Sequence, residues 1–175
     1  MKILAFAASN SERSINRILA TYTANLVPDA AVEILDINDY EMPIFSEQRE
    51  RQLGHPEQAK RFYSKITDAD AIIVSFAEHN GTYTAAYKNL FDWTSRISKK
   101  VFQNKPTLLL STSPGASGAA SVLKEASKSA PYFAADVKAS ISVPSFYENF
   151  DRSTNQLINP EIEKELLSAG SRLVL

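Results

Sequence analysis

A run of polar and small residues follows the most apolar short segment of the chain. Residues 71–76 read Ala-Ile-Ile-Val-Ser-Phe, a pattern typical of a central parallel strand that helices cover on both sides. The next residues are Ala77, Glu78, His79, Asn80 and Gly81, which offer a carboxylate, a carboxamide and an approachable backbone. Because open α/β sheets bind ligands at the carboxyl ends of their strands, this set suits the edge of a flat heterocycle. The alternative is an ordinary loop that caps the next helix.

A second candidate loop lies near the amino terminus, between a predicted strand at residues 2–8 and a predicted helix at residues 14–26. It carries hydroxyl, amide and guanidinium groups from Ser9, Ser11, Arg13, Ser14 and Asn16. The first amides of a helix have no partners within it and the helix dipole favours negative charge there, so the loop predicts an anion site. It has neither the glycine-rich dinucleotide fingerprint nor the Gly-Lys-Ser/Thr of a nucleotide phosphate loop, which favours a single terminal phosphate. Ser14 would cap the helix with or without a ligand.

In this order and spacing, the two loops resemble those of the NAD(P)H-dependent FMN reductase family, which includes quinone and azo-dye reductases. The resemblance covers roughly residues 1–143. The first family loop reads approximately Gly-Ser-x-Arg-x-x-Ser-x-Asn, and it is matched, with a small shift at the arginine, by Ala8, Ser9, Arg13, Ser14 and Asn16. The second reads Pro-Glu-Tyr-Asn before a Lys-Asn-x-x-Asp-Trp helix, and it is matched by Glu78, Asn80, Lys88, Asn89, Asp92 and Trp93.

The chain also departs from the family pattern. Ala77 replaces the usual proline, and His79 replaces an aromatic residue that normally leans on the flavin. A proline expected between Asn80 and Lys88 is absent. The third family loop often ends in a Gly-Gly pair. Residues 113–120 contain no adjacent glycines and keep only one of the two. These changes bear on substrate range and flavin affinity more than on the fold.

The resemblance implies an enzyme that binds FMN noncovalently and passes hydride from NAD(P)H to a flavin, quinone, azo compound or similar acceptor. It assigns the phosphate to Ser9, Ser11, Ser14 and Asn16, with charge added by Arg13, and the ring to residues 77–81. The third loop would form a wall of the ring pocket through Ser113, Gly115 and Ser117. Since the cofactor carries the chemistry, no catalytic side chain is expected.

Strands and helices that alternate along the chain must position these loops. The expected strands are residues 2–8, 32–37, 71–76, 106–112 and 137–143, and the expected helices are residues 14–26, 56–67, 84–98, 117–129 and 160–173. Such alternation implies a parallel sheet with right-handed crossovers. We therefore expect one α/β domain over residues 1–175, a flavodoxin-like three-layer sandwich with strand order 2-1-3-4-5. Both loops then border the crevice between strands 1 and 3.

Composition narrows the function classes. The 175 residues are 44% hydrophobic and carry a net charge of −1, which shows no bias towards nucleic acid or anionic lipid. The absence of cysteine excludes disulfides and thiol catalysis, and His55 and His79 lack the spacing of a zinc site. No apolar run approaches the roughly 20 residues that span a bilayer. Because the sequence begins directly with a strand, we expect a cytoplasmic protein that is not exported.

The resemblance also implies a homodimer or tetramer that packs through the helix at residues 84–98. Trp93 and Phe91 are the expected aromatic anchors of that interface. Read alone, Lys88 and Asp92 are an ordinary exposed ion pair. The polar stretch at residues 38–55 is long for a simple connection, which suggests a functional segment or one that reaches across a subunit contact.

Further alternatives stay open at this point. Three aromatic residues near the carboxyl terminus would either cover a neighbouring flavin or anchor the terminal helix: Phe146, Tyr147 and Phe150. A flavodoxin-like electron carrier is a second function class, which the nearly neutral charge disfavours. A third is an interaction module that has lost its flavin, suggested by the departures from the family loops.

Overall fold

The five predicted strands form one parallel sheet in the computed structural model, which describes residues 1–174. The strands are β1 (Lys2–Ala8), β2 (Ala31–Leu35), β3 (Ala71–Phe76), β4 (Pro106–Thr112) and β5 (Asp136–Val143). Their order is β2-β1-β3-β4-β5, and every neighbouring pair is parallel. The predicted flavodoxin-like order is confirmed.

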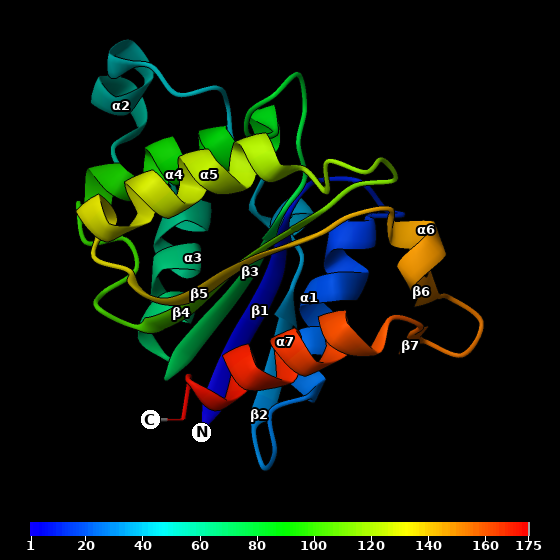
Figure 1. The fold of residues 1–175 in the computed structure, drawn as a ribbon. Coiled ribbons are helices and arrows are strands. Elements are labelled where there is room, and N and C mark those ends of the chain that lie inside the picture. The colour runs from blue at the N-terminus through cyan, green and yellow to red at the C-terminus, as the bar shows by residue number, and fades with distance from the viewer. Residues whose placement is uncertain (175) are drawn as a thin grey trace.

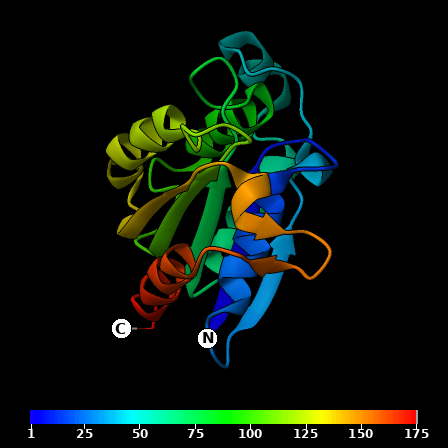
Figure 2. The ribbon, with the colours of Figure 1, turned by 45° about the vertical axis from the view of Figure 1, so that its right-hand side comes forward.

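Helices cover both faces of this sheet and make the fold three-layered (Figure 1). The long helices are α1 (Ile15–Asn25), α3 (Glu57–Thr67), α4 (Ala85–Ile97), α5 (Ala120–Ser129) and α7 (Pro160–Ser171). α3, α4 and α5 lie on one face, whereas α1 and α7 lie on the other, and the turned view in Figure 2 shows α5 and α7 on opposite sides of the sheet. A short helix, α2 (Glu47–Leu53), stands off from these layers.

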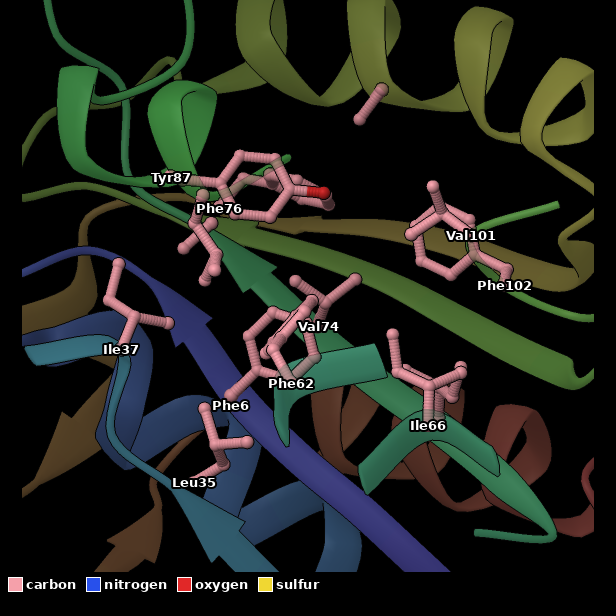
Figure 3. Packing of buried hydrophobic residues seen from close by; sticks show 14 of the residues in the cluster. Phe6, Leu35, Ile37, Phe62, Ile66, Val74, Phe76, Tyr87, Val101 and Phe102 are labelled. Atoms are coloured by element: carbon pink, nitrogen blue, oxygen red, sulfur yellow. The ribbon is translucent and has the colours of Figure 1, made fainter. Parts of the chain in front are cut away.

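Alternation along the strands explains the two-sided core. Successive side chains of a strand point to opposite faces, so Leu4 and Phe6 join the cluster under α3, α4 and α5, while Ile3 and Ala5 join the cluster under α1 and α7. Figure 3 shows the first cluster, where the Phe6 and Phe62 rings meet edge to face at 5.5 Å. All six residues of β3 are buried, as expected for the central strand.

Within the sheet, β2 ends two residues earlier than predicted, and the other main differences from the predicted elements lie outside the sheet. The stretch at residues 38–55 contains α2 and a 3-10 turn, η1 (Ile37–Tyr40). α5 begins three residues later than predicted because Gly118 and Ala119 have left-handed backbone angles that an α-helix cannot use. A second 3-10 turn, η2 (Ala130–Phe133), follows α5. After β5 the chain forms α6 (Phe146–Asn149) and a small hairpin of β6 (Phe150–Asp151) and β7 (Gln156–Leu157), which the sequence patterns did not predict.

Candidate functional site

A cavity of about 250 Å³ lies where the carboxyl ends of β1, β3 and β4 meet the start of α1. The chain runs from β1 to β2 on one side and returns to β3 on the other, so the cavity occupies the switch point of the sheet. Residues from all three predicted loops line it. Of the predicted site residues, it brings together Ser9, Ser11, Arg13, Ser14, Asn16, Ala77, Glu78, His79 and Ser113.

The loop after β1 consists of successive short hydrogen-bonded turns that lead into α1. The Ser9 hydroxyl accepts from the Ser11 amide at 3.2 Å, and the Ser11 hydroxyl accepts from the Arg13 amide at 3.3 Å. The Ser14 hydroxyl caps α1 by accepting from the Arg17 amide at 3.2 Å. The first turn of α1 contains no acidic residue, so nothing on the helix itself neutralises the positive end of its dipole. This loop retains an anion-binding character.

Asn16 has a different role from the phosphate contact that the sequence predicted. Its side chain is 2% exposed, and its amide group donates to the Thr112 carbonyl at 3.1 Å. Its oxygen accepts from the Ser75 hydroxyl at 2.7 Å and from the Thr112 amide at 3.0 Å. The carboxamide therefore ties α1 to the ends of β3 and β4 and is committed to the protein interior.

The loop after β3 contributes its first three residues to the cavity, but the carboxylate among them is already bonded. One oxygen of Glu78 accepts from the Val122 amide in the first turn of α5 at 2.9 Å. The residue at the start of α5, Ala119, has no side chain able to cap a helix. Glu78 thus supplies the missing cap from another loop, which fixes the β3 loop to α5.

Asn80 and Gly81 lie at the tip of a tight turn, outside the cavity. His79 and Thr82 exchange two backbone hydrogen bonds of 3.0 and 3.2 Å across them. The backbone φ angles of Asn80 and Gly81 are +52° and +83°, which identifies an Asn-Gly type I′ turn. Turn geometry therefore gives Asn80 and Gly81 a structural role, in addition to the ring contacts that the family resemblance predicts.

The third loop reaches the cavity through Ser113 and its neighbours Thr112 and Pro114. Gly115 and Ser117 are exposed and lie outside the cavity. Gly118 has a φ of +58°, and a Cβ there would approach the Ser142 hydroxyl to 2.3 Å. This glycine is required for close packing against the end of β5.

The aromatic residues after β5 divide between two roles. Phe146 and Phe150 are buried in the cluster under α1 and α7, with their rings stacked at 5.1 Å. Tyr147 is 55% exposed and lines the cavity beside Pro114. Adjacent residues on the short helix α6 point in different directions, so Phe146 anchors the core and Tyr147 faces the site. The sequence does not separate these three roles, and three further lining residues were not predicted: Ile15, Thr112 and Pro114.

The expected interface anchor Trp93 is a core residue. Its side chain is fully buried, donates to the Pro43 carbonyl at 2.7 Å and meets the Phe45 ring edge to face at 5.1 Å. Asn89 accepts from the Phe45 amide at 2.8 Å and donates to the Met42 carbonyl at 3.0 Å. The prediction that Trp93 anchors a subunit contact is wrong, because the ring holds the 42–45 segment onto α4 of its own chain.

Phe91, the second expected anchor, is only partly buried and packs against Phe133, with their ring centroids 4.7 Å apart. Lys88 and Asp92 form the exposed ion pair predicted from their spacing, at 2.7 Å. Contacts within the chain thus account for Asn89 and Trp93 of α4.

The donor set and shape of the cavity suit a flat ring that carries one phosphate. Its lining combines serine hydroxyls, the start of α1 and Arg13 with the planar side chains of His79 and Tyr147. Small-molecule sites commonly enclose about 300–1,000 Å³, so this cavity would leave part of such a ring open.

Comparison with known proteins agrees with this geometry. The family model for NADPH-dependent FMN reductases matches residues 1–147. The chain belongs to this family. Within it, the chain is 27% identical over 169 residues to the NADH-dependent flavin reductase subunit 2 of Lactobacillus johnsonii, covering 92% of this chain and 89% of the relative. It is 33% identical over 122 residues to a 2-hydroxy-1,4-benzoquinone reductase of Burkholderia sp.

The Burkholderia alignment covers 69% of this chain and only 64% of that relative, so the chain spans less than two thirds of its length. The flavoenzyme FerB, an NAD(P)H:(acceptor) oxidoreductase from Paracoccus denitrificans, superimposes with a TM-score of 0.78 at 21% identity. That match covers 99% of this chain and 94% of FerB, and it supports the fold. Within residues 1–174, no helix is both long and apolar enough to cross a membrane.

Proposed function

We propose that this protein is an FMN-dependent oxidoreductase that takes hydride from NAD(P)H and delivers it to a small-molecule acceptor. The observation that carries the proposal is the cavity at the β1–β3 switch point, whose lining combines phosphate-type donors with planar side chains. Membership of the NADPH-dependent FMN reductase family supports the same assignment.

Two groups of cavity residues would bind different parts of the cofactor. Ser9, Ser11 and Ser14, with the first amides of α1 and the charge of Arg13, would hold the phosphate. Ala77, the backbone of Glu78 and His79, Ser113 and Tyr147 would hold the ring. Bound FMN supplies hydride acceptance from a nicotinamide and donation to an acceptor, while the protein supplies position and hydrogen bonds. No acidic or basic side chain needs to act on the reacting atoms.

The acceptor is proposed from relatives and from the shape of the site. Two relatives are named for reduction of a benzoquinone and of a flavin, both of which are flat and uncharged in their reacting part. A cavity that leaves one side of the ring open allows such a molecule to stack there in place of the nicotinamide. Quinones and free flavins are therefore the proposed acceptors, with azo compounds as further candidates.

We also propose a homodimer, or a tetramer built from it, on the side of α4 that carries the 42–53 segment. α2 has no buried residue; its last residue, Leu53, is 53% exposed, and Ile44, three residues before the helix, is 73% exposed. Exposed apolar side chains at both ends of one short segment favour a protein partner. A second subunit there would supply the wall that the shallow cavity lacks.

The dimer is tested with Ile44→Glu and Leu53→Glu together, measured by analytical ultracentrifugation at micromolar concentration. The double variant should be monomeric, whereas Leu167→Glu, at another exposed leucine on α7, should leave the oligomer intact. A monomeric wild-type protein would remove the proposal.

Purified protein tests the activity directly. We expect FMN to bind at one per chain and NADH or NADPH to be oxidised in the presence of 1,4-benzoquinone. Binding without oxidation would favour an electron carrier, and no binding would favour a module that has lost its flavin.

Because NAD(P)H is made and used inside the cell, we propose that the enzyme is cytoplasmic.

A further inference from the structure

A further cavity, of about 390 Å³, adjoins the candidate flavin site at the start of α1. The two cavities share Arg13 and Ser14, so the further one continues from the residues proposed to hold the flavin phosphate. Its other lining residues come from the β1 loop, from α1 and from the loop of the β6–β7 hairpin: Glu12, Arg17, Ile18, Thr21, Arg152 and Asn155. We call it the arginine cavity. The function proposed above assigns no role to these other residues.

The hairpin that carries Arg152 is held against α1. The Phe150 ring of β6 meets the Tyr22 ring of α1 edge to face at 5.4 Å, and both side chains are buried. At the start of the hairpin loop, the Asp151 carboxylate accepts from the Ser153 amide at 2.8 Å and from the Ser153 hydroxyl at 2.6 Å. Figure 1 and Figure 2 both show the hairpin beside α1. The backbone of Arg152 is thus fixed next to the helix whose start borders the flavin site.

The charged groups of the arginine cavity are mainly basic. Three guanidinium groups line it, from Arg13, Arg17 and Arg152, against the single carboxylate of Glu12. Arg17 is paired with Asp36 at 2.8 Å, whereas the side chains of Arg13 and Arg152 make no ion pair or hydrogen bond within residues 1–174. Since the whole chain carries a net charge of −1, the cavity is a local excess of positive charge. Such an excess attracts anions.

The phosphate of one flavin does not account for this arrangement. Arg17 and Arg152 lie outside the lining of the candidate flavin site. A guanidinium group binds phosphate oxygens through paired N–H donors, and Thr21 and Asn155 add uncharged polar groups beside it. The volume falls within the range of about 300–1,000 Å³ that is usual for small-molecule sites, which is more than a phosphate alone needs. The cavity therefore suits a phosphate that is attached to a nucleoside.

We propose that the arginine cavity binds a second phosphate group beside that of the flavin, carried on the adenosine half of a dinucleotide. The inference rests on the proposed function, which puts the flavin phosphate at the shared residues Arg13 and Ser14. Two dinucleotides can bring such a group: NADPH through its 2′-phosphate, or FAD through its second phosphate where it replaces FMN. Arg152 would contact this group and set the preference for NADPH over NADH, or for FAD over FMN.

Two pairs of ligands that differ in the second phosphate test the inference by calorimetry. NADP⁺ and NAD⁺, which cannot donate hydride, are titrated into protein saturated with FMN, and FAD and FMN are titrated into protein freed of flavin. Without a contact to the second phosphate, NADP⁺ would bind no more tightly than NAD⁺, and FAD would bind more weakly than FMN because its first phosphate carries less charge. We expect a preference of at least about tenfold for NADP⁺ over NAD⁺ or for FAD over FMN, and the pair that shows it identifies the source.

Variants of one residue assign the contact. Arg152→Gln should reduce the preference at least about fivefold, because a hydrogen bond to a charged group is lost. Its FMN affinity should stay within about twofold of wild type, since Arg152 does not line the flavin site. Arg152→Lys keeps the charge without the paired donors and should reduce the preference less. Arg172→Gln removes another exposed guanidinium, at the end of α7, and should change neither quantity.

The inference is overturned if FMN binds but neither pair shows a preference, or if Arg152→Gln keeps the wild-type preference. A chain that binds no FMN would instead remove the proposed function, and this inference with it. Arg152 is exposed in the hairpin loop, so its replacement should not prevent folding. The comparison of the ligand pairs on the wild-type protein needs no variant.

Discussion

The loops after β1 and β3 reach the same cavity with similar polar residues, yet they use those residues differently. The β1 loop forms short turns among its own serines, and the first turn of α1 that follows contains no acidic residue. The polar groups of the β3 loop are already engaged by the protein itself, because Glu78 caps α5, Thr82 bonds Glu125 and Asn80 forms a turn with Gly81.

The difference shows that polar residues at the end of a strand become ligand groups only when the fold has not already bonded them. A helix start is available by construction, since its first amides have no partners within the helix. The same free amides explain why a carboxylate that lies beside an uncapped helix accepts a hydrogen bond from them. An unpaired amide at the start of a helix lowers stability. We therefore expect the β1 loop to determine cofactor affinity and the β3 loop to determine the shape and stability of the ring pocket.

The largest effect is expected from Ser14→Asp. Aspartate caps a helix as well as serine does, so the stability of α1 should be unchanged. Its charge would face the phosphate, and two unit charges at about 4 Å near a protein surface repel by about 4 kcal/mol. FMN affinity, measured by quenching of flavin fluorescence, should fall on the order of 100- to 1,000-fold, while riboflavin affinity should stay within about threefold. Equal losses for the two ligands would place the phosphate elsewhere.

Asn16→Ala should destabilise the fold by about 2–4 kcal/mol, because it leaves the buried Ser75 hydroxyl and the Thr112 backbone without partners. Urea denaturation measures this loss, and Asn10→Ala, an exposed neighbour in the same loop, should change the free energy of unfolding by less than about 0.5 kcal/mol. The folded fraction of Asn16→Ala should retain most of its FMN affinity. A stable variant that no longer binds FMN would restore Asn16 as a phosphate ligand.

Glu78→Ala should cost about 1 kcal/mol of stability through the lost cap of α5, and Glu78→Gln, which can still accept from the Val122 amide, should cost less. Both variants should bind FMN within about threefold of wild type. If Glu78→Ala instead weakened FMN by more than about 30-fold at unchanged stability, the carboxylate would be a ring contact and the contrast between the loops would fail.

Ala119→Gly is expected to have the smallest effect and the opposite sign. Ala119 has a φ of +60°, a conformation that costs alanine about 1–2 kcal/mol, whereas glycine loses about 0.5–1 kcal/mol of additional chain entropy on folding. The variant should gain about 0.5–1 kcal/mol by urea denaturation. Ala120→Gly, one residue into α5, should lose stability, and a loss in both variants would show that the left-handed position is unstrained.

The sheet was predictable because its signal is local and strong. β3 and β4 have the bounds that the apolar pattern gave, and the Pro at position 106 starts a strand where no ladder donor is needed. α2 was missed although Ser46 and Gly54 mark its ends, because it buries none of its residues and so lacks apolar periodicity.

The site was predictable by position and less so by role. The sequence placed both loops at one end of the sheet, but it does not show which partner a polar side chain finds. Asn80-Gly81 is a strong turn signal in its own right, and the structure forms that turn. The burial of Trp93 depends on the 42–45 segment folding back onto α4, a contact between residues about 50 positions apart that local patterns do not encode.

A titration of the purified protein with FMN and, in parallel, with riboflavin tests the central claim most directly. The two ligands share the ring and differ in the phosphate, so their ratio reports the β1 loop alone. We predict that flavin fluorescence is quenched to saturation at one FMN per chain, and that riboflavin binds at least about 30-fold more weakly, as expected for loss of two or more charge-assisted hydrogen bonds. Equal affinity for the two ligands, or no saturable quenching by FMN, would contradict the account.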